Sequence, residues 1–188
     1  MHLKSFILLF LKSQIFFIVE LLPRPVPGGD QIVAGGKPIP YSFKRLTGSD
    51  VPLLKELLGV FGEAFEEPET YQGRVPDDGY LGSLLAQEHF IVLVAQSGES
   101  TVGGLVAYVL DKFEQQRREI YIYDLAVLKD HRRHGVATAL IRQLRQIGKE
   151  SGAYVIFVQA DRGDIGAIKL YQSLGRREDV YHFDIGVE

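Results

Sequence analysis

The sequence predicts a single α/β (α+β) domain, in which a mixed, largely antiparallel sheet carries helices on both faces. Three observations lead to this prediction. Strand-like and helix-like segments are interspersed along most of the 188 residues, a length that fits one domain. Two apolar runs around a short Gly/Ser turn predict an antiparallel hairpin. Two later strand-like segments are separated by a helix-like one, which is typical of a parallel pair with a helical connection.

The first predicted elements are a short strand and two helices. Residues 41–46 (YSFKRL) alternate in polarity with a period of two, which predicts a strand. The stretch TGSD at 47–50 supplies helix-capping side chains, and the helix predicted at 51–65 tolerates Pro52 in its first turn. Residues 77–87 (DDGYLGSLLAQ) predict a second, shorter helix.

The centre of the chain predicts the hairpin, a long strand and a helix. Residues 90–96 and 101–110 are the apolar arms around the turn SGES. Residues 119–128 are rich in β-branched and aromatic side chains and predict a strand. Apolar residues recur near a 3.6 period in 136–152, a helix that Gly152 ends.

The last third of the chain predicts three more elements. Residues 153–160 (AYVIFVQA) predict a buried strand, and residues 164–175 predict a helix that Gly175 closes. Residues 179–187 (DVYHFDIGV) alternate in polarity and predict a final strand, with His182 and Asp184 on one of its faces.

Composition excludes some chemistry. The chain has no cysteine, which rules out disulfides, thiolate metal sites and a cysteine nucleophile. Its net charge of -3 disfavours a nucleic-acid-binding body, which is usually basic. Residues 1–40 hold four basic and two acidic residues, so the rest of the chain is more acidic than the total indicates. Such a body favours a cationic partner.

Residues 1–40 differ in character from the rest. Residues 5–22 are strongly apolar, but Lys12 and Glu20 interrupt them, and a spanning helix needs about 20 apolar residues. No small-residue cleavage site of the usual secretory form precedes the Pro- and Gly-rich linker that follows. Three interpretations stay open: a translated extension outside the fold, a membrane-touching amphipathic helix, or a signal or anchor. We favour the first, with the domain at 41–188, and expect a cytoplasmic protein.

A basic loop before the central helix predicts an anion site. Arg132, Gly135 and Ala137 stand between a strong strand and a strong helix, and a helix N-terminus offers unpaired N–H groups and partial positive charge. The loop lacks the Gly-Lys-Ser/Thr of a nucleotide P-loop and the three glycines of a dinucleotide fingerprint. A merely solvated loop is the alternative. His131 and His134 could pair on a metal, an alternative that we disfavour, and we expect no metal.

These residues resemble the acyl-CoA pyrophosphate loop of the GNAT N-acetyltransferase superfamily, and the chain is most similar to its aminoglycoside 3-N-acetyltransferases. The resemblance covers about residues 41–188. It depends on segments that read FEQ, EIYIYDLAV, HRRHGVATALI, GAYVIFVQAD, LYQSLGRRE and HFDI, at 113–115, 119–127, 131–141, 152–161, 170–178 and 182–185. Asp164 departs from the superfamily pattern, where an Asn often opens this helix.

The resemblance implies transfer of an acetyl group from acetyl-CoA to the 3-amino group of an aminoglycoside, resistance to that antibiotic, and a homodimer. Apart from the resemblance, attack of an amine on a thioester has four requirements. These are a bound acyl donor, an uncharged amine, stabilisation of the oxyanion and a proton for the departing thiolate. We expect direct attack, with the main-chain N–H of Leu125 or Ala126 facing the thioester oxygen. The expected cofactor-binding residues are Leu125, Ala126, Val127, Arg132, Arg133, His134, Gly135, Val136, Ala137 and Thr138.

Four acidic residues and one tyrosine are expected around the reacting groups. Tyr171 is the candidate acid for the thiolate, with a packing role as the alternative. Asp124 ends an apolar strand and is either a buried polar pivot or a base in a cleft, the interpretation we favour. Glu66 and Glu67 belong to a charged run that we expect in a loop bordering the acceptor site in this family's topology. Asp184 is expected in the same cleft.

Three rival functions stay open. The first is an N-acetyltransferase for another cationic amine, such as a polyamine, a protein N-terminus or a lysine. The second is a non-catalytic acyl-CoA-binding module, in which Tyr171 and Asp124 are structural. The third is a nucleic-acid binder that uses the basic loop, which the acidic body disfavours.

Overall fold

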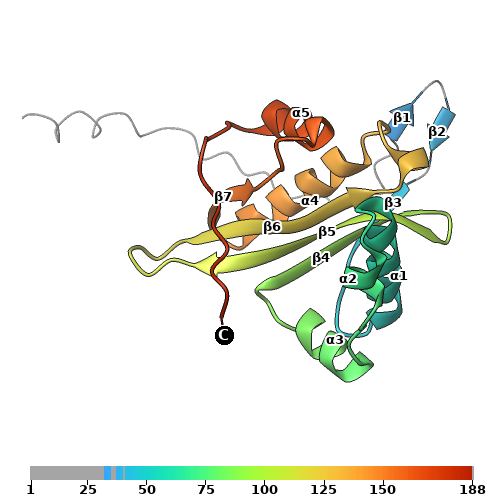
Figure 1. Ribbon diagram of the computed structural model, residues 1–188, viewed down its shortest axis with the longest axis horizontal. Helices are drawn as coiled ribbons and strands as arrows, with labels where there is room; N and C mark the ends of the chain where they lie inside the picture. The colour runs from blue at the N-terminus through green and yellow to red at the C-terminus, as the bar shows by residue number, and fades with distance from the viewer. Residues whose placement is uncertain (1–31, 35–36, 40, 188) are drawn as a thin grey trace, which may run out of the picture.

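The computed structural model describes residues 32–34, 37–39 and 41–187, and it confirms a mixed sheet flanked by helices (Figure 1). Most of the predicted N-terminal extension lies outside the described residues. Its two described pieces, β1 (Ile32–Ala34) and β2 (Lys37–Ile39), pair with each other in a small antiparallel sheet of their own.

The main sheet has five strands in the order β3-β4-β5-β6-β7. The first three pairings are antiparallel and the last, between β6 and β7, is parallel. The predicted hairpin is therefore present, with Gly98 in a left-handed conformation at its turn (φ 62°). The strands are Tyr41–Arg45, Phe90–Ser97, Ser100–Asp111, Arg118–Val127 and Ala153–Val158.

Helices cover the two faces of this sheet. On one face lie α1 (Val51–Ala64), α2 (Pro68–Gln72) and α3 (Asp78–Leu85). On the other lie α4 (Val136–Glu150) and α5 (Ile165–Leu174) (Figure 1). A short 3-10 turn, Lys129–His131, links β6 to the loop before α4.

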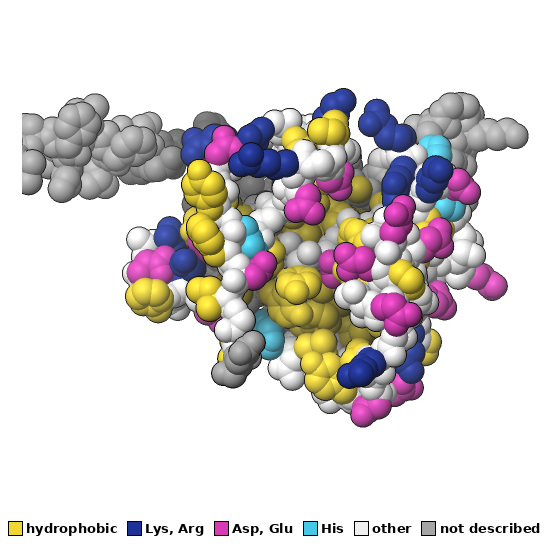
Figure 2. Space-filling view, viewed as in Figure 1, with side chains coloured by type: hydrophobic (Ala, Val, Ile, Leu, Met, Phe, Trp, Pro, Cys, Tyr) yellow, Lys and Arg dark blue, Asp and Glu magenta, His cyan; other side chains and the backbone are white. Residues whose placement is uncertain are grey.

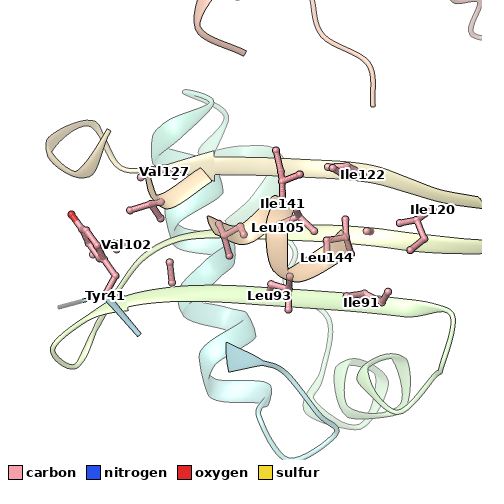
Figure 3. Packing of buried hydrophobic residues seen from close by; sticks show 14 residues of the cluster. Tyr41, Ile91, Leu93, Val102, Leu105, Ile120, Ile122, Val127, Ile141 and Leu144 are labelled. Atoms are coloured by element: carbon pink, nitrogen blue, oxygen red, sulfur yellow. The ribbon is translucent and has the colours of Figure 1, made fainter. Parts of the chain in front are cut away.

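Alternate residues of the strands form two hydrophobic clusters, one beneath each helical layer. In β4, Ile91 and Leu93 pack toward α4, while Val92 and Val94 pack toward α1. Figure 3 shows the α4-side cluster, in which Leu144 and Ile141 of the helix lie over the central strands. The α1 side is packed so closely that a side-chain carbon at Gly104 would lie 2.8 Å from Cδ2 of Leu57 in the helix.

The final strand predicted at 179–187 is wrong, because these residues form no strand in the structure. A strand obtains its hydrogen bonds from a neighbour, and no described strand pairs with this segment. The side chains of Tyr181, Phe183 and Ile185 are 79–87% exposed, so the apolar alternation has no apolar surface to cover within the described chain.

Two smaller features also differ from the sequence predictions. The charged run after α1 is not all loop, because Glu69 lies in the first turn of α2. Asp50 occupies the N-cap position of α1 but makes no capping bond to the helix. Its carboxylate instead accepts hydrogen bonds from Thr47 and Lys44, which hold the turn that precedes the helix.

None of the helices within the described ranges combines the length and the apolarity that crossing a bilayer requires.

Candidate active site

The loop before α4 presents unpaired backbone N–H groups. Gly135 is the N-cap residue and has φ 82°, a left-handed conformation that glycine adopts without strain. No side chain of the described residues caps the helix, and the first N–H to bond backwards is that of Ala139, to the Gly135 carbonyl. The N–H groups of 136–138 therefore have no intrahelical acceptor and, with the helix dipole, favour an anion here.

The basic side chains of this loop have different partners. Arg132 donates from Nε to the Val127 carbonyl at 2.8 Å and so ties the loop to the end of β6. His131 Nδ1 lies 3.1 Å from the Tyr41 hydroxyl, which anchors the other side of the loop to β3. Arg133 has a left-handed backbone (φ 66°), and its exposed side chain makes no hydrogen bond to a described residue. The Nδ1 atom of His134 is buried and has no partner among the described residues.

The second half of β6 has one free edge. Its pairing with β7 ends at Ile122 and Val158, while β6 continues to Val127 alongside β5 only. The Leu128 N–H donates to the Val102 carbonyl across β5, and hydrogen-bonding positions alternate along an antiparallel strand. The backbone groups of Ala126 therefore face β5, whereas those of Leu125 face the free edge. Of the two residues predicted at this position, Leu125 is the one with an available N–H.

A β-bulge at Tyr123 decides where Asp124 points. Val106 pairs with Asp124 and the next residue of β5 pairs with Ile122, so Tyr123 is the extra residue of β6. Ile120 and Ile122 belong to the α4-side cluster, and strict alternation would have placed Asp124 there too. Instead Asp124 contacts Tyr71 of α2 on the opposite face.

Asp124 is a half-buried carboxylate with one hydrogen bond. The Tyr71 hydroxyl donates to its Oδ1 at 3.0 Å, and Oδ2 has no hydrogen-bond partner among residues 41–187. Burial raises the pKa of Asp124, the Tyr71 hydrogen bond opposes that rise, and the nearby charge of Glu67 adds to it. A carboxylate with a raised pKa and a free oxygen can accept a proton.

Three tyrosines lie beside Asp124 and form what we call the tyrosine floor: Tyr108 of β5 with Tyr121 and Tyr123 of β6. The Tyr123 ring meets those of Tyr108 and Tyr121 edge to face, at centroid distances of 5.8 and 6.0 Å. Tyr123 is 64% exposed, although such a ring is usually largely covered. Figure 2 shows a hollow on this face, with hydrophobic side chains on its floor and acidic side chains along its borders.

Two segments border the tyrosine floor. On one side is α2, which carries Tyr71 and follows Glu67. On the other side is the C-terminal segment, where His182 Nδ1 lies 3.1 Å from Gln159, a residue that also accepts from Tyr121. Aromatic rings flanked by carboxylates form a surface suited to a cyclic molecule that carries positive charge.

Tyr171 belongs to the α4-side layer. It lies in α5 and packs against the α4-side cluster. Burial raises the pKa of its hydroxyl to about 12, and the Asp164 carboxylate adds to the rise. The hydroxyl thus stays protonated at neutral pH and makes no hydrogen bond to a described residue. Asp164 itself caps α5 by accepting from the Ala167 N–H at 2.8 Å, so an aspartate serves at this position as a cap.

The predicted acidic residues are not equally close to Asp124. Glu67, the N-cap residue of α2, is near enough for its charge to raise the pKa of both Asp124 and Tyr71. Glu66 precedes it in a left-handed conformation (φ 60°) and lines a separate open depression of about 720 Å³ between α1 and α2. The Asp184 side chain is 97% exposed and bonds His182 at 3.0 Å, so it borders the hollow rather than being buried in it.

Sequence reasoning missed Tyr71 and the tyrosine floor. Tyr121 and Tyr123 alternate within one predicted strand, and this spacing was a usable signal that they share a face. Tyr71 had no such signal, because it lies 53 positions from its partner in a short helix that was not predicted.

The sequence model of the Acetyltransferase (GNAT) family matches residues 54–175. Among curated proteins, rat N-acetyltransferase 8B is 31% identical over 90 residues, which cover 48% of this chain and 40% of that protein. Human N-acetyltransferase 8 is 30% identical over 93 residues, covering 50% and 41%. The match thus spans about two fifths of the length of these curated relatives.

Solved structures match over more of their length. An aminoglycoside acetyltransferase from an uncultured soil metagenomic sample is 52% identical, with a TM-score of 0.78, and the match covers 79% of this chain and 99% of that one. A second soil metagenomic aminoglycoside acetyltransferase, in complex with sisomicin, is 34% identical with a TM-score of 0.73, covering 79% and 97%.

Proposed function

The chain belongs to the Acetyltransferase (GNAT) family, and we propose that it transfers the acetyl group of acetyl-CoA to an amine of an aminoglycoside. The observation that carries this proposal is the position of the half-buried Asp124, between the tyrosine floor and the free edge of β6. The 52% identity to an aminoglycoside acetyltransferase over nearly its whole length supports the acceptor class.

The donor end of the site is the α4 N-terminus with the end of β6. The free N–H groups of 136–138 and the exposed Arg133 supply donors and positive charge for the pyrophosphate of acetyl-CoA. The free edge of β6 offers backbone groups to the pantetheine arm, as it would to an added strand. The Leu125 N–H then faces the thioester oxygen and stabilises the negative charge that develops there.

The reaction we propose is direct attack. The neutral amine nitrogen bonds to the thioester carbonyl carbon, and the nitrogen proton passes to Oδ2 of Asp124. The tetrahedral intermediate then collapses, the C–S bond breaks, and the thiolate takes a proton from the Tyr171 hydroxyl. Asp124 then releases its proton to water and the Tyr171 phenolate takes one from water, which restores both groups and leaves the acetylated amine and free coenzyme A as products.

The acceptor in this proposal is a polycation. Aminoglycosides carry several ammonium groups on sugar-like rings, and the tyrosine floor offers ring faces to them. Glu67 and Asp184 stand on opposite borders of that floor and attract the remaining charges. The resemblance of the sequence to aminoglycoside 3-N-acetyltransferases supports the 3-amino group as the target.

A panel of amines tests this proposal. Release of free thiol from acetyl-CoA is measured with gentamicin- and sisomicin-type aminoglycosides, a polyamine, a peptide N-terminus and a lysine peptide. We expect aminoglycosides to give the highest kcat/KM, and mass and NMR analysis of the product to place the acetyl group on the 3-amino nitrogen. Faster turnover of a polyamine or peptide would leave only the broader acetyltransferase assignment.

Substitution of Tyr171 by phenylalanine tests the proposed acid. The change keeps the ring that packs against the α4-side cluster and removes only the hydroxyl. We expect kcat to fall by on the order of 100-fold, within the usual range for acid–base steps, with an unchanged melting temperature. A fall below about threefold would assign Tyr171 to packing alone.

We also propose that the protein is a homodimer. The outer edge of β7 has no strand partner among the described residues, and the nearby side chains of Val155 and Phe157 are partly exposed. Residues 179–187 alternate in polarity and have no strand partner among the described residues. In a dimer, this segment of one copy would pair with the free β7 edge of the other. Light scattering is expected to give twice the chain mass of 21.1 kDa, and removal of 179–187 to give a monomer. A full-length monomer at micromolar concentration would contradict the proposal.

A further inference from the structure

We propose that Tyr71 is a positioning residue, which holds Asp124 by one carboxylate oxygen so that the other faces the acceptor amine. This inference rests on the proposed function, because it assigns a role to Tyr71 through the base Asp124. The first observation is the contact itself: the Tyr71 hydroxyl donates to Oδ1 at 3.0 Å and leaves Oδ2 without a described partner.

The Tyr71 ring is fixed by packing. Its centroid lies 5.6 Å from that of Phe61 and 5.7 Å from that of Phe65, at the end of α1. Those two rings also contact each other at 5.7 Å, so three aromatic side chains form a closed cluster. The hydroxyl is therefore presented to Asp124 in one orientation, with little freedom left to lose when it makes the bond.

The helix that carries Tyr71 is held against α1 at a glycine, where a side chain would fit only if its neighbours moved. A Cβ on Gly62 would lie 3.1 Å from Gln72 Oε1 and 3.3 Å from Pro68 Cα. The Glu67 N–H also donates to the Gly62 carbonyl at 3.0 Å. A five-residue helix has little stability of its own, so these contacts with α1 set its position and that of Tyr71.

The hydrogen bond has a consequence for protonation. Burial favours the neutral form of Asp124, and so does the charge of Glu67, whereas donation from Tyr71 favours the carboxylate. The hydroxyls of Tyr108 and Tyr121 also face Asp124, and burial raises the pKa of both, so they are neutral at physiological pH. Tyr71 is thus the described neighbour that lowers the pKa of this base.

The experiment compares Tyr71→Phe with the unmodified protein over a range of pH. Phenylalanine keeps the packing with Phe61 and Phe65 and removes the donor. Loss of the donor raises the pKa of Asp124 further, so the acidic limb of kcat/KM is expected to move to higher pH. At pH 7 we expect kcat to fall on the order of tenfold, the usual effect of one hydrogen bond to a charged group, with KM for acetyl-CoA unchanged.

Two further comparisons separate positioning from packing. Tyr80→Phe removes a hydroxyl from the exposed surface of α3 and is expected to leave the pH profile unchanged. The double variant Tyr71→Phe, Asp124→Asn is expected to have the same kcat as Asp124→Asn alone, because Tyr71 acts through that carboxylate. Additive losses, or a Tyr71→Phe profile that overlays the original one, would overturn the proposal.

The outcome is distinguishable from failure of the proposed function. The amine panel decides the acceptor with the unmodified protein, before any substitution is made. The pH profile of Tyr71→Phe is then measured with whichever amine is turned over. A polyamine acceptor would therefore refute the aminoglycoside proposal and still leave the role of Tyr71 open to this test.

Discussion

Replacement of Gly135 by aspartate is expected to abolish acetyl-CoA binding while the protein stays folded. The carboxylate would stand at the N-terminus of α4, where the unpaired N–H groups of 136–138 are proposed to hold the pyrophosphate. Two unit charges about 4 Å apart repel by roughly 4 kcal/mol near a protein surface, which corresponds to about a 1,000-fold loss of affinity. Titration calorimetry with acetyl-CoA measures the loss.

Two variants separate charge from backbone strain in this experiment. Gly135→Asn has nearly the shape of aspartate and tolerates φ 82° equally well, but it is neutral, so we expect a much smaller loss of affinity. Gly152→Asp introduces the same charge at another left-handed glycine (φ 76°), just beyond the other end of α4. It is expected to lower stability similarly and to leave acetyl-CoA affinity unchanged. Equal affinities for all three variants would refute the anion site.

The parts of the fold that were predicted correctly are those with a strong local pattern. In α4 the apolar period, the glycine before it and Gly152 after it are all contained within one stretch of sequence. The hairpin of β4 and β5 is likewise local, because two long apolar runs flank a two-residue turn. The helix N-terminus at which we propose the anion site was predictable for the same reason, since the helix start and its loop are contiguous in the chain.

The parts that were missed depend on partners distant in sequence. The alternation in 179–187 was real, but a strand also needs a neighbour, and none is present in the described chain. The small helix α2 has a weak helical sequence and is held by Gly62 of α1. The bulge at Tyr123 arises from the pairing register of β5 and β6, which no local pattern encodes.

The bulge also explains why the site could be predicted only in part. From the sequence, Asp124 was expected as a carboxylate where the apolar strand ends, whereas in the structure it lies inside β6, which continues to Val127. Strict alternation, however, places it on the face of Ile122, away from Tyr121 and Tyr123. Only the extra residue brings the carboxylate and the tyrosines to the same face, and with them Tyr71 from α2.

Replacement of Asp124 by asparagine is expected to lower kcat by 10²- to 10⁴-fold, the usual range for loss of a general base. Asparagine keeps the size of the side chain and an oxygen that can accept from Tyr71. Both the base and the attacking amine must be deprotonated for the reaction. Because burial raises the pKa of Asp124, turnover falls as the pH drops through that raised pKa. Steady-state rates across the acidic pH range measure the effect.

The shape of the pH profile identifies the base. Below both pKa values, log(kcat/KM) of the unmodified protein is expected to rise with a slope of about 2, because Asp124 and the acceptor amine each lose a proton. In Asp124→Asn the slope falls to about 1, since only the amine still titrates. Glu69→Gln removes a carboxylate from the first turn of α2, the helix that carries Tyr71, and is expected to keep both the rate and the slope. If Asp124→Asn retained the steeper slope, the proton would be passing to another group, and the position of Asp124 beside the tyrosine floor would serve acceptor binding alone.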